Sequence, residues 1–169
     1  MKNKRYSGYI AGLVLVLLGL FVIITYNKLV KKEEAVKLQW NQLQSAYQRR
    51  VDLIPNLVNV VKGQTDFEQT TLTQITAARA KASAITYSAT EPTSEKVSQS
   101  IEAQNELAAA TNNFIAVVEK YPNLTGTEAF KGLQTQLEGT ERRIKFSRKD
   151  FNDAVAGYNS SVRGFPVNL

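Results

Sequence analysis

A long uncharged stretch near the N-terminus constrains this chain more than any other feature. No charged residue occurs from Tyr6 to Asn27, and the segment from Tyr9 to Tyr26 is almost wholly apolar. As a helix rising about 1.5 Å per residue, these 22 residues reach about 33 Å, against about 30 Å for the hydrocarbon core of a bilayer. The sequence therefore predicts one membrane-spanning helix over residues 9–26, after a basic N-terminal flank over residues 1–8.

A cleaved secretory signal is the competing interpretation, because it also has a basic start before an apolar core. The apolar core of this chain is longer than the usual length of about 7 to 15 residues. It closes on Thr25-Tyr26-Asn27-Lys28, without an Ala-x-Ala-like cleavage site. We therefore expect an uncleaved, single-pass anchor in the lipid bilayer.

The formal net charge of +6 is concentrated beside this segment. Residues 1–37 hold seven basic and two acidic residues, a net charge of +5, whereas residues 38–169 hold 14 basic and 13 acidic residues, a net charge of +1. Lys and Arg beside a spanning helix can meet anionic lipid headgroups, and a nearly neutral remainder is poorly suited to a polyanion. We expect no nucleic-acid partner.

The positive-inside rule does not orient the anchor, because four positive charges, counting the terminal amine, precede it and four follow it. A short N-terminus before the first helix is the usual form of a signal anchor. We therefore expect the C-terminal domain to lie outside the cytoplasm.

A pattern of small residues in the anchor predicts a weak contact between copies. Gly8 and Gly12 form a G-x-x-x-G motif, and Gly19 lies about two turns further along the same face. Gly8 is at the edge of the segment, which weakens the motif. We expect at most a weak homo-oligomer through the membrane helix.

The chain has no cysteine and no histidine. This composition excludes disulfides, Cys/His zinc sites, iron–sulfur clusters bound by cysteine, thiolate nucleophiles and His-based acid/base catalysis. Two carboxylate pairs remain, Glu138 with Glu141 and Glu102 with Glu106, but di-metal sites in helix bundles usually add Glu-x-x-His pairs. We predict no metal, no cofactor and no enzymatic activity. The alternative is an enzyme, or a regulatory subunit of a membrane protease system, that uses carboxylates and Tyr158.

After residue 27, apolar positions recur at spacings of three and four, as in amphipathic helices. Four stripes result: Val36, Trp40, Leu43 and Tyr47; Leu57, Val61, Gln64, Leu72, Ile75, Ala78, Ala82 and Ile85; Val97, Ile101, Gln104, Ala108, Thr111, Ile115 and Val118; Leu133, Leu137, Ile144, Phe151, Val155, Tyr158 and Val162. Such helices need one another to bury these faces. We predict an all-α chain in which the single N-terminal transmembrane helix is followed, over residues 27–169, by an antiparallel up-down-up-down four-helix bundle.

Turn residues mark the expected helix boundaries. Asp52 is a candidate cap for a helix with Pro55 in its first turn, which divides the first two helices near residues 50–54. The alternative is one longer helix that breaks at Gly63. The expected caps of the third and fourth helices are Ser94 and Thr127.

Short motifs spread over nearly all of residues 26–166 point to one family. They are YNKLV at 26–30, QRRVDLIPNLV at 48–58, VKG at 61–63, AARAKA at 77–82, VVEKYP at 117–122, LEGTERRI at 137–144, YN at 158–159 and FP at 165–166. In this order and spacing they resemble the LemA family of bacterial membrane-anchored helical proteins. The resemblance implies a single-pass protein with an antiparallel helical bundle, and it implies no reaction.

The segment around Pro55 mixes charge, apolar bulk and turn chemistry more densely than any other. We predict that it is a docking surface for partner proteins of unknown identity, formed by Arg49, Arg50, Asp52, Pro55 and Asn56. Arg50 continues the first stripe, so we expect it at the end of the bundle rather than in open solvent. A plain helix junction is the alternative. The predicted function is a non-enzymatic, membrane-anchored scaffold.

Charged residues on two helices are candidates for interhelical ion pairs. Arg79 lies at the edge of the second stripe, and Glu138, Glu141 and Arg143 crowd neighbouring turns of the last helix. The alternative is solvated surface pairs, worth less than about 1 kcal/mol each.

Overall fold

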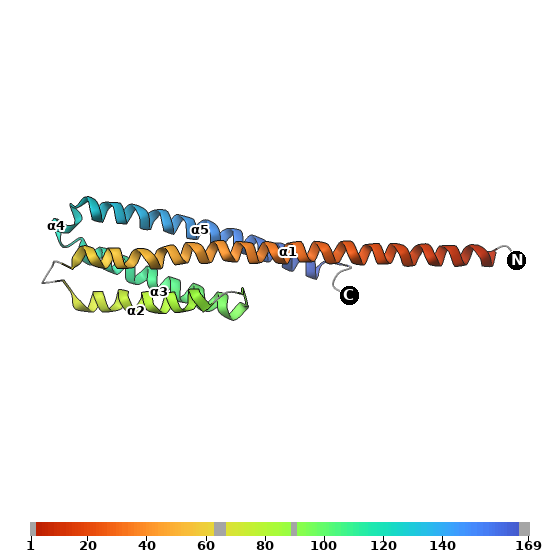
Figure 1. The fold of residues 1–169 in the computed structure, drawn as a ribbon, viewed down its shortest axis with the longest axis horizontal. Coiled ribbons are helices and arrows are strands. Elements are labelled where there is room, and N and C mark those ends of the chain that lie inside the picture. The colour runs from red at the N-terminus through yellow and green to blue at the C-terminus, as the bar shows by residue number, and fades with distance from the viewer. Residues whose placement is uncertain (1–2, 63–66, 89–90, 166–169) are drawn as a thin grey trace. The chain divides into compact units, whose positions relative to one another are not determined.

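The protein is described by a computed structural model, which covers residues 3–62, 67–88 and 91–165. These residues form helices and contain no strand (Figure 1). The helices are α1 (Asn3–Val61), α2 (Gln69–Ser88), α3 (Ser94–Val118), the short α4 (Pro122–Thr125) and α5 (Glu128–Arg163). The prediction of an all-α chain is confirmed. Gly63, Gln64 and the first two residues of the basic flank lie outside the described residues.

The chain divides into two compact units. One consists of Met1–Val36 together with Asn152–Leu169, and the other is Lys37–Phe151. Both α1 and α5 therefore contribute a segment to each unit.

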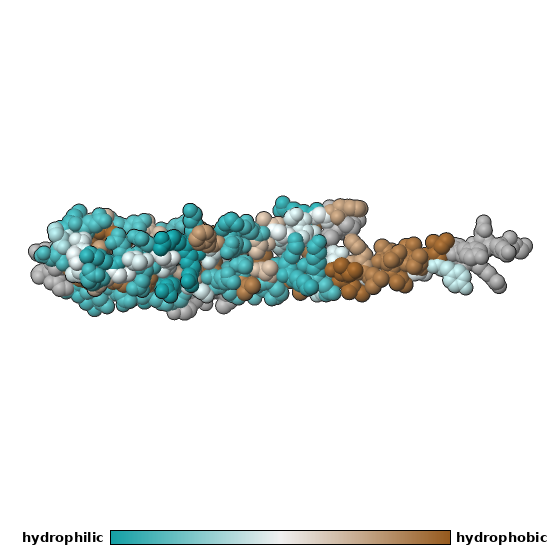
Figure 2. Space-filling view, turned by 90° about the horizontal axis from the view of Figure 1, so that it is seen from above, coloured by the Kyte–Doolittle hydropathy of each residue, from teal (hydrophilic) through white to brown (hydrophobic). Residues whose placement is uncertain are grey.

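The first unit contains the apolar segment. α1 includes the one helical stretch in the described residues that is long and apolar enough to cross a membrane. Its side chains are uncovered: Leu13 is 61% exposed and Ile24 is 66% exposed, and Figure 2 shows the apolar surface of this helix. A run of exposed apolar side chains this long is unfavourable in water and favourable in lipid. The helix is thus consistent with membrane anchoring.

The second unit has one apolar core to which α1, α2, α3, α4 and α5 all contribute. Fully buried residues such as Leu57 of α1, Ile75 of α2 and Leu107 of α3 lie in this cluster. α2 and α3 pack along each other (Figure 1). Trp40 and Phe151 pack together with ring centroids 5.2 Å apart. Trp40, which the stripe analysis placed on the inner face of its helix, is buried as expected.

The predicted division of the first two helices near residues 50–54 is wrong. α1 continues through Asp52 and Pro55 to Val61, as in the alternative with the later break. Asp52 therefore does not cap a helix; it lies exposed on the surface of α1 and accepts a hydrogen bond of 2.8 Å from Gln48 Nε2. The long second stripe is shared between α1 and α2, because the chain turns between them.

The expected caps were partly right. Thr93, and not Ser94, caps α3: its hydroxyl accepts a hydrogen bond of 3.3 Å from the amide of Lys96, and Ser94 is the first helical residue. Thr127 precedes α5, and its hydroxyl accepts a hydrogen bond of 3.3 Å from the amide of Phe130, as a cap does. Threonine and serine are both good caps, so side-chain chemistry does not choose between Thr93 and Ser94. Thr93 is the cap because it has extended backbone angles, whereas Ser94 is already helical.

The buried core predicts a strong contrast between two leucines. Leu107 is fully buried in α3, whereas Leu38 on α1 is 56% exposed. Leu107→Ala should lower the free energy of unfolding by about 2–5 kcal/mol, because it leaves a cavity, and Leu38→Ala should change it by less than about 0.5 kcal/mol. Denaturant unfolding of the full chain in detergent, followed by circular dichroism, measures both. Equal effects of the two substitutions would contradict the core described above.

Candidate functional site

The residues of the predicted junction lie on two different faces of α1. Arg49, Asp52 and Asn56 are exposed, and Pro55 is half-buried. Arg50 is only 2% exposed. It is therefore shielded from solvent, as the continuation of the stripe indicated. The expectation that it lies at the end of the bundle is wrong, because α1 runs on to Val61 and Arg50 contacts residues well inside α3 and α5.

The guanidinium group of Arg50 joins three helices. Its Nη1 donates to the main-chain oxygen of Gln104 on α3 at 2.8 Å and to the side-chain Oε1 of Gln104 at 3.1 Å. Its Nη2 forms an ion pair of 2.5 Å with the carboxylate of Glu141 on α5, whose side chain is 51% exposed. The Nε of Arg50 is buried and has no hydrogen-bond partner among the described residues. A buried charge is tolerated only when it is paired and hydrogen-bonded, so these contacts are a condition for the burial of Arg50.

A second arginine, Arg148, connects the same helices but lies on α5. Arg148 of α5 donates through Nε to the hydroxyl of Tyr47 on α1 at 2.8 Å and through Nη2 to Oδ1 of Asn105 on α3 at 3.0 Å. Its guanidinium carbon lies 5.4 Å from the centroid of the Tyr47 ring, a cation–π distance. Burial raises the pKa of Tyr47 above 10.0, and the charge of Arg148 partly opposes this rise. The two arginines thus link the same three helices.

Pro55 and Arg79 meet through a main-chain carbonyl. Proline has no amide hydrogen, so the carbonyl of Val51, four residues earlier in α1, lacks its usual helical donor. Arg79 of α2 supplies one: its Nε donates to the oxygen of Val51 at 3.2 Å. The structure therefore explains how α1 continues through a proline without an orphaned carbonyl at a buried position.

The carboxylates have separate surroundings. Glu141 pairs with Arg50, while Arg79 contacts the main chain, and Glu138 and Arg143 are exposed on α5. Glu106 of the other candidate pair forms an exposed ion pair of 2.5 Å with Lys81, which raises the pKa of Lys81. Among residues 3–62, 67–88 and 91–165, no group of three or more acidic residues is placed to hold a metal ion. The contacts of Arg50, Arg79 and Arg148 join helices to one another.

Most of these side chains can be recognised in the sequence, but their pairing cannot. The helical pattern suggests Arg79 as a partner for the carboxylates of the last helix, whereas Arg79 donates to the main chain of Val51. The polar contacts of Gln104, Tyr47 and Arg148 have no signal in their local pattern. One signal was available for the contact of Arg79. A proline inside an apolar helical pattern leaves a carbonyl that needs a donor from another helix, and an arginine on a predicted apolar face is a natural donor.

A family model and a curated relative both point to the LemA family. A model of the LemA family matches residues 39–169, a range that includes Arg50, Arg79 and Glu141. The chain is 22% identical over 142 residues to Protein LemA of Metamycoplasma hominis, covering 84% of this chain and 61% of that relative. It is 36% identical over 59 residues to Magnetosome protein MamQ 2 of Paramagnetospirillum magneticum, covering 35% of this chain and 22% of the relative. The chain thus spans 61% or less of the length of these curated relatives.

The contact between Pro55 and Arg79 predicts energetic coupling. Arg79→Leu should destabilise the fold by about 1–3 kcal/mol, because the carbonyl of Val51 loses its donor at a buried position. Pro55→Ala returns an amide donor to the same carbonyl, so Arg79→Leu should cost less in the Pro55→Ala background. A double-mutant cycle from denaturant unfolding measures this difference, with Arg143→Leu on the exposed face of α5 as the control. Additive effects within about 0.5 kcal/mol would show that Arg79 does not compensate for the proline.

The burial of Tyr47 predicts a dependence on alkaline pH. Because the folded chain raises the pKa of Tyr47 above 10.0, it holds the phenol proton more tightly than the unfolded chain does. This contribution to stability is fully present below pH 10.0 and is lost as the pH rises through the pKa of the folded state. Tyr47→Phe should therefore flatten the alkaline fall in unfolding free energy. Lys81→Gln, measured in parallel, separates the effect of the other raised pKa. Identical pH profiles for wild type and Tyr47→Phe would count against this account.

Proposed function

Since the chain belongs to the LemA family, we propose that it is a single-pass membrane protein whose helical domain holds partner proteins at the membrane and catalyses no reaction. The observation that carries this proposal is the make-up of α1. The same helix contains the stretch with membrane-spanning length and the buried residues from Trp40 to Val61 of the second unit. Membrane attachment and the folding of the domain therefore depend on one element.

The proposed domain is an antiparallel up-down-up-down four-helix bundle made from the C-terminal part of α1, α2, α3 and the N-terminal part of α5. Two observations support it. These helices share one apolar core, and Arg50 and Arg148 connect α1, α3 and α5 by charge-assisted hydrogen bonds. We also propose that the domain lies outside the cytoplasm, the orientation expected above for a signal anchor.

The proposed docking surface is the exposed side of the predicted junction, formed by Arg49, Asp52 and Asn56 and called here the outer face of α1. These three residues follow one another at helical spacing. The opposite side of the same turns carries Arg50 and Leu57, which are buried, so the outer face is fixed by the core beneath it. Arg49 can bind a partner's carboxylate with two hydrogen bonds, and Asn56 offers both a donor and acceptors. The expected partner is a protein that presents an acidic side chain.

Cross-linking from the outer face tests this function. A photoreactive benzoylphenylalanine at position 56 of the full chain, in the membranes of the producing cells, should capture discrete partners, because that position is exposed. Arg49→Glu should reduce these adducts at least fivefold by placing a repulsive charge on the surface. Arg143→Glu makes the same charge change on the exposed face of α5 and serves as the matched control. Arg50 is unsuitable as a probe, since it is buried and connects α1 with α3 and α5, so its loss would destabilise the domain itself.

The outcomes separate the scaffold from its alternative. Adducts that persist in Arg49→Glu but disappear in Arg143→Glu would move the docking surface to α5. Unchanged adducts in both, together with loss of a measurable activity in Glu138→Gln/Glu141→Gln, would favour an enzyme or a regulatory subunit that uses carboxylates.

A further inference from the structure

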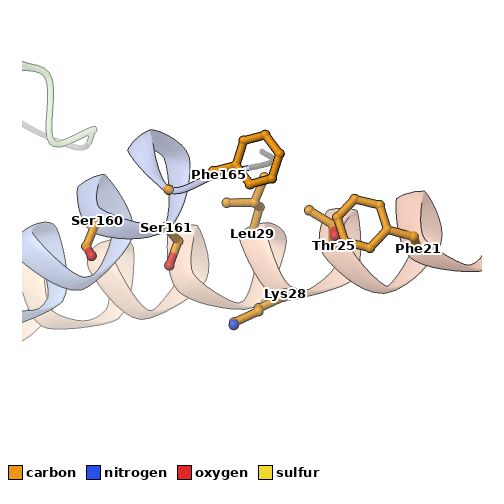
Figure 3. Close-up of a pocket in the computed structure, with 8 residues that line it drawn as sticks. Phe21, Thr25, Lys28, Leu29, Ser160, Ser161 and Phe165 are labelled. Atoms are coloured by element: carbon orange, nitrogen blue, oxygen red, sulfur yellow. The ribbon is translucent and has the colours of Figure 1, made fainter. Parts of the chain in front are cut away.

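A cavity in the first unit lies beside the apolar segment. It has a volume of about 370 Å³ and is bounded by α1 and by the C-terminal end of α5 (Figure 3). α1 contributes Phe21, Lys28 and Leu29 to its lining, and the end of α5 contributes Ser160, with Phe165 just beyond the helix. The function proposed above does not use this cavity.

The position of the cavity along α1 shows at what depth of a bilayer it would lie. Phe21 and Thr25 belong to the uncharged stretch, whereas Lys28 is the first charged residue after it. From Thr25 to Leu29 the helix rises about 6 Å, which is similar to the depth of the headgroup layer on one side of a membrane. When the apolar segment spans a bilayer, the cavity lies at the level of the lipid headgroups.

The lining changes in polarity along the same direction. Figure 3 shows the ring of Phe21 at the end of the cavity nearer the apolar segment, with the hydroxyl groups of Ser160 and Ser161 at the other end. The ammonium group of Lys28 points away from Phe21. A phospholipid has the same order of groups, with apolar chains first and then a phosphate that accepts hydrogen bonds.

Partly buried hydrogen bonds hold the end of α5 against α1. Phe165, just beyond the end of α5, is exposed. Lys32 Nζ donates to the main-chain oxygen of Gly157 at 2.9 Å and to the hydroxyl of Ser161 at 2.6 Å. Phe165 is nevertheless 83% exposed, next to a segment whose own apolar side chains are exposed. An exposed phenylalanine beside basic residues is typical of a segment that lies in a membrane interface.

The charge around the cavity favours an anionic occupant. Lys28, Lys31 and Arg163 are exposed basic residues of this unit. The acidic residues of this unit are Glu33 and Glu34 on α1 and Asp153 on α5, none of which lines the cavity. Basic residues beside a spanning helix attract anionic lipids, and a lysine ammonium with hydroxyl donors is a common way to bind a phosphate group.

We infer that this cavity binds an anionic phospholipid of the leaflet next to the domain, with Lys28 and Ser160 at its phosphate and Phe165 at the boundary between headgroup and acyl chain. The end of α5 is then a second membrane contact of the protein, in addition to the anchor. This inference rests on the proposed membrane anchoring.

A fluorescent label at the end of α5 tests this contact. Because the chain has no cysteine, Phe165→Cys in the full protein can carry a single nitrobenzoxadiazole label. Phe146→Cys is the matched control, since Phe146 is a 63% exposed phenylalanine on the same helix but in the other unit. In vesicles of phosphatidylcholine and phosphatidylglycerol, the label at residue 165 should be protected from dithionite and quenched by lipids with brominated acyl chains. The label at residue 146 should react with dithionite and show little quenching.

Lipid preference tests the binding of the headgroup. At residue 165, brominated phosphatidylglycerol should quench more strongly than brominated phosphatidylcholine. Lys28→Gln should reduce this preference by clearly more than about fivefold, the factor expected for one basic residue at an open lipid surface. Lys31→Gln removes an equal charge that does not line the cavity, and it should change the preference by about fivefold or less.

Flotation of the vesicles after a carbonate wash separates failure of the anchor from failure of the cavity. Protein that does not float with the vesicles would overturn both the anchoring and the lipid site. Protein that floats, but whose label at residue 165 behaves like the label at residue 146, would overturn the lipid site alone. Equal losses of preference in Lys28→Gln and Lys31→Gln would show a general surface charge effect and would also overturn the site.

Discussion

The helical domain depends on a positive charge that lies inside it. Arg50 is shielded from water on α1, and its charge is balanced by Glu141 of α5 and by two oxygens of Gln104 on α3. Displacing α3 or α5 would remove part of this compensation while Arg50 stayed buried, and a buried charge with too few partners is costly. An apolar core alone accepts several relative positions of its helices. The fork of donors on a guanidinium group accepts few, so Arg50 restricts which arrangement of these helices is stable.

The parts of the fold that sequence analysis predicted well are those that depend on neighbouring residues. The apolar segment is recognisable from its length, and the stripe of Trp40, Leu43 and Tyr47 from its helical spacing, because both patterns are local. The break assigned to Asp52 and Pro55 was wrong for a related reason. Both residues are common at the start of a helix, and local patterns favour that interpretation. The donor that allows the helix to continue is Arg79, on a different helix, so no nearby residue reveals it.

Several residues of the candidate site were predicted from the sequence, but the contacts between them were not. Arg50 and Glu141 were both singled out, yet in separate groups, since they are 91 positions apart and nothing in either local pattern joins them. Helical spacing did separate Arg50 from Arg49, because only Arg50 continues the apolar stripe. That distinction divides the segment into a part that stabilises the domain and a part that faces solvent. The docking surface proposed for partners therefore rests on Arg49 and Asn56, and no longer on the pair of arginines.

The proline in α1 also has a consequence for how the sequence can change over evolutionary time. With proline at residue 55, the carbonyl of Val51 depends on the side chain of Arg79. With any other amino acid at residue 55, the helix supplies its own donor and the arginine loses this role. Loss of Arg79 is therefore harmful in one genetic background and much less so in the other. Proline at residue 55 should therefore occur together with arginine at residue 79. A lineage that loses Arg79 before Pro55 passes through a destabilised intermediate, whereas one that loses Pro55 first does not.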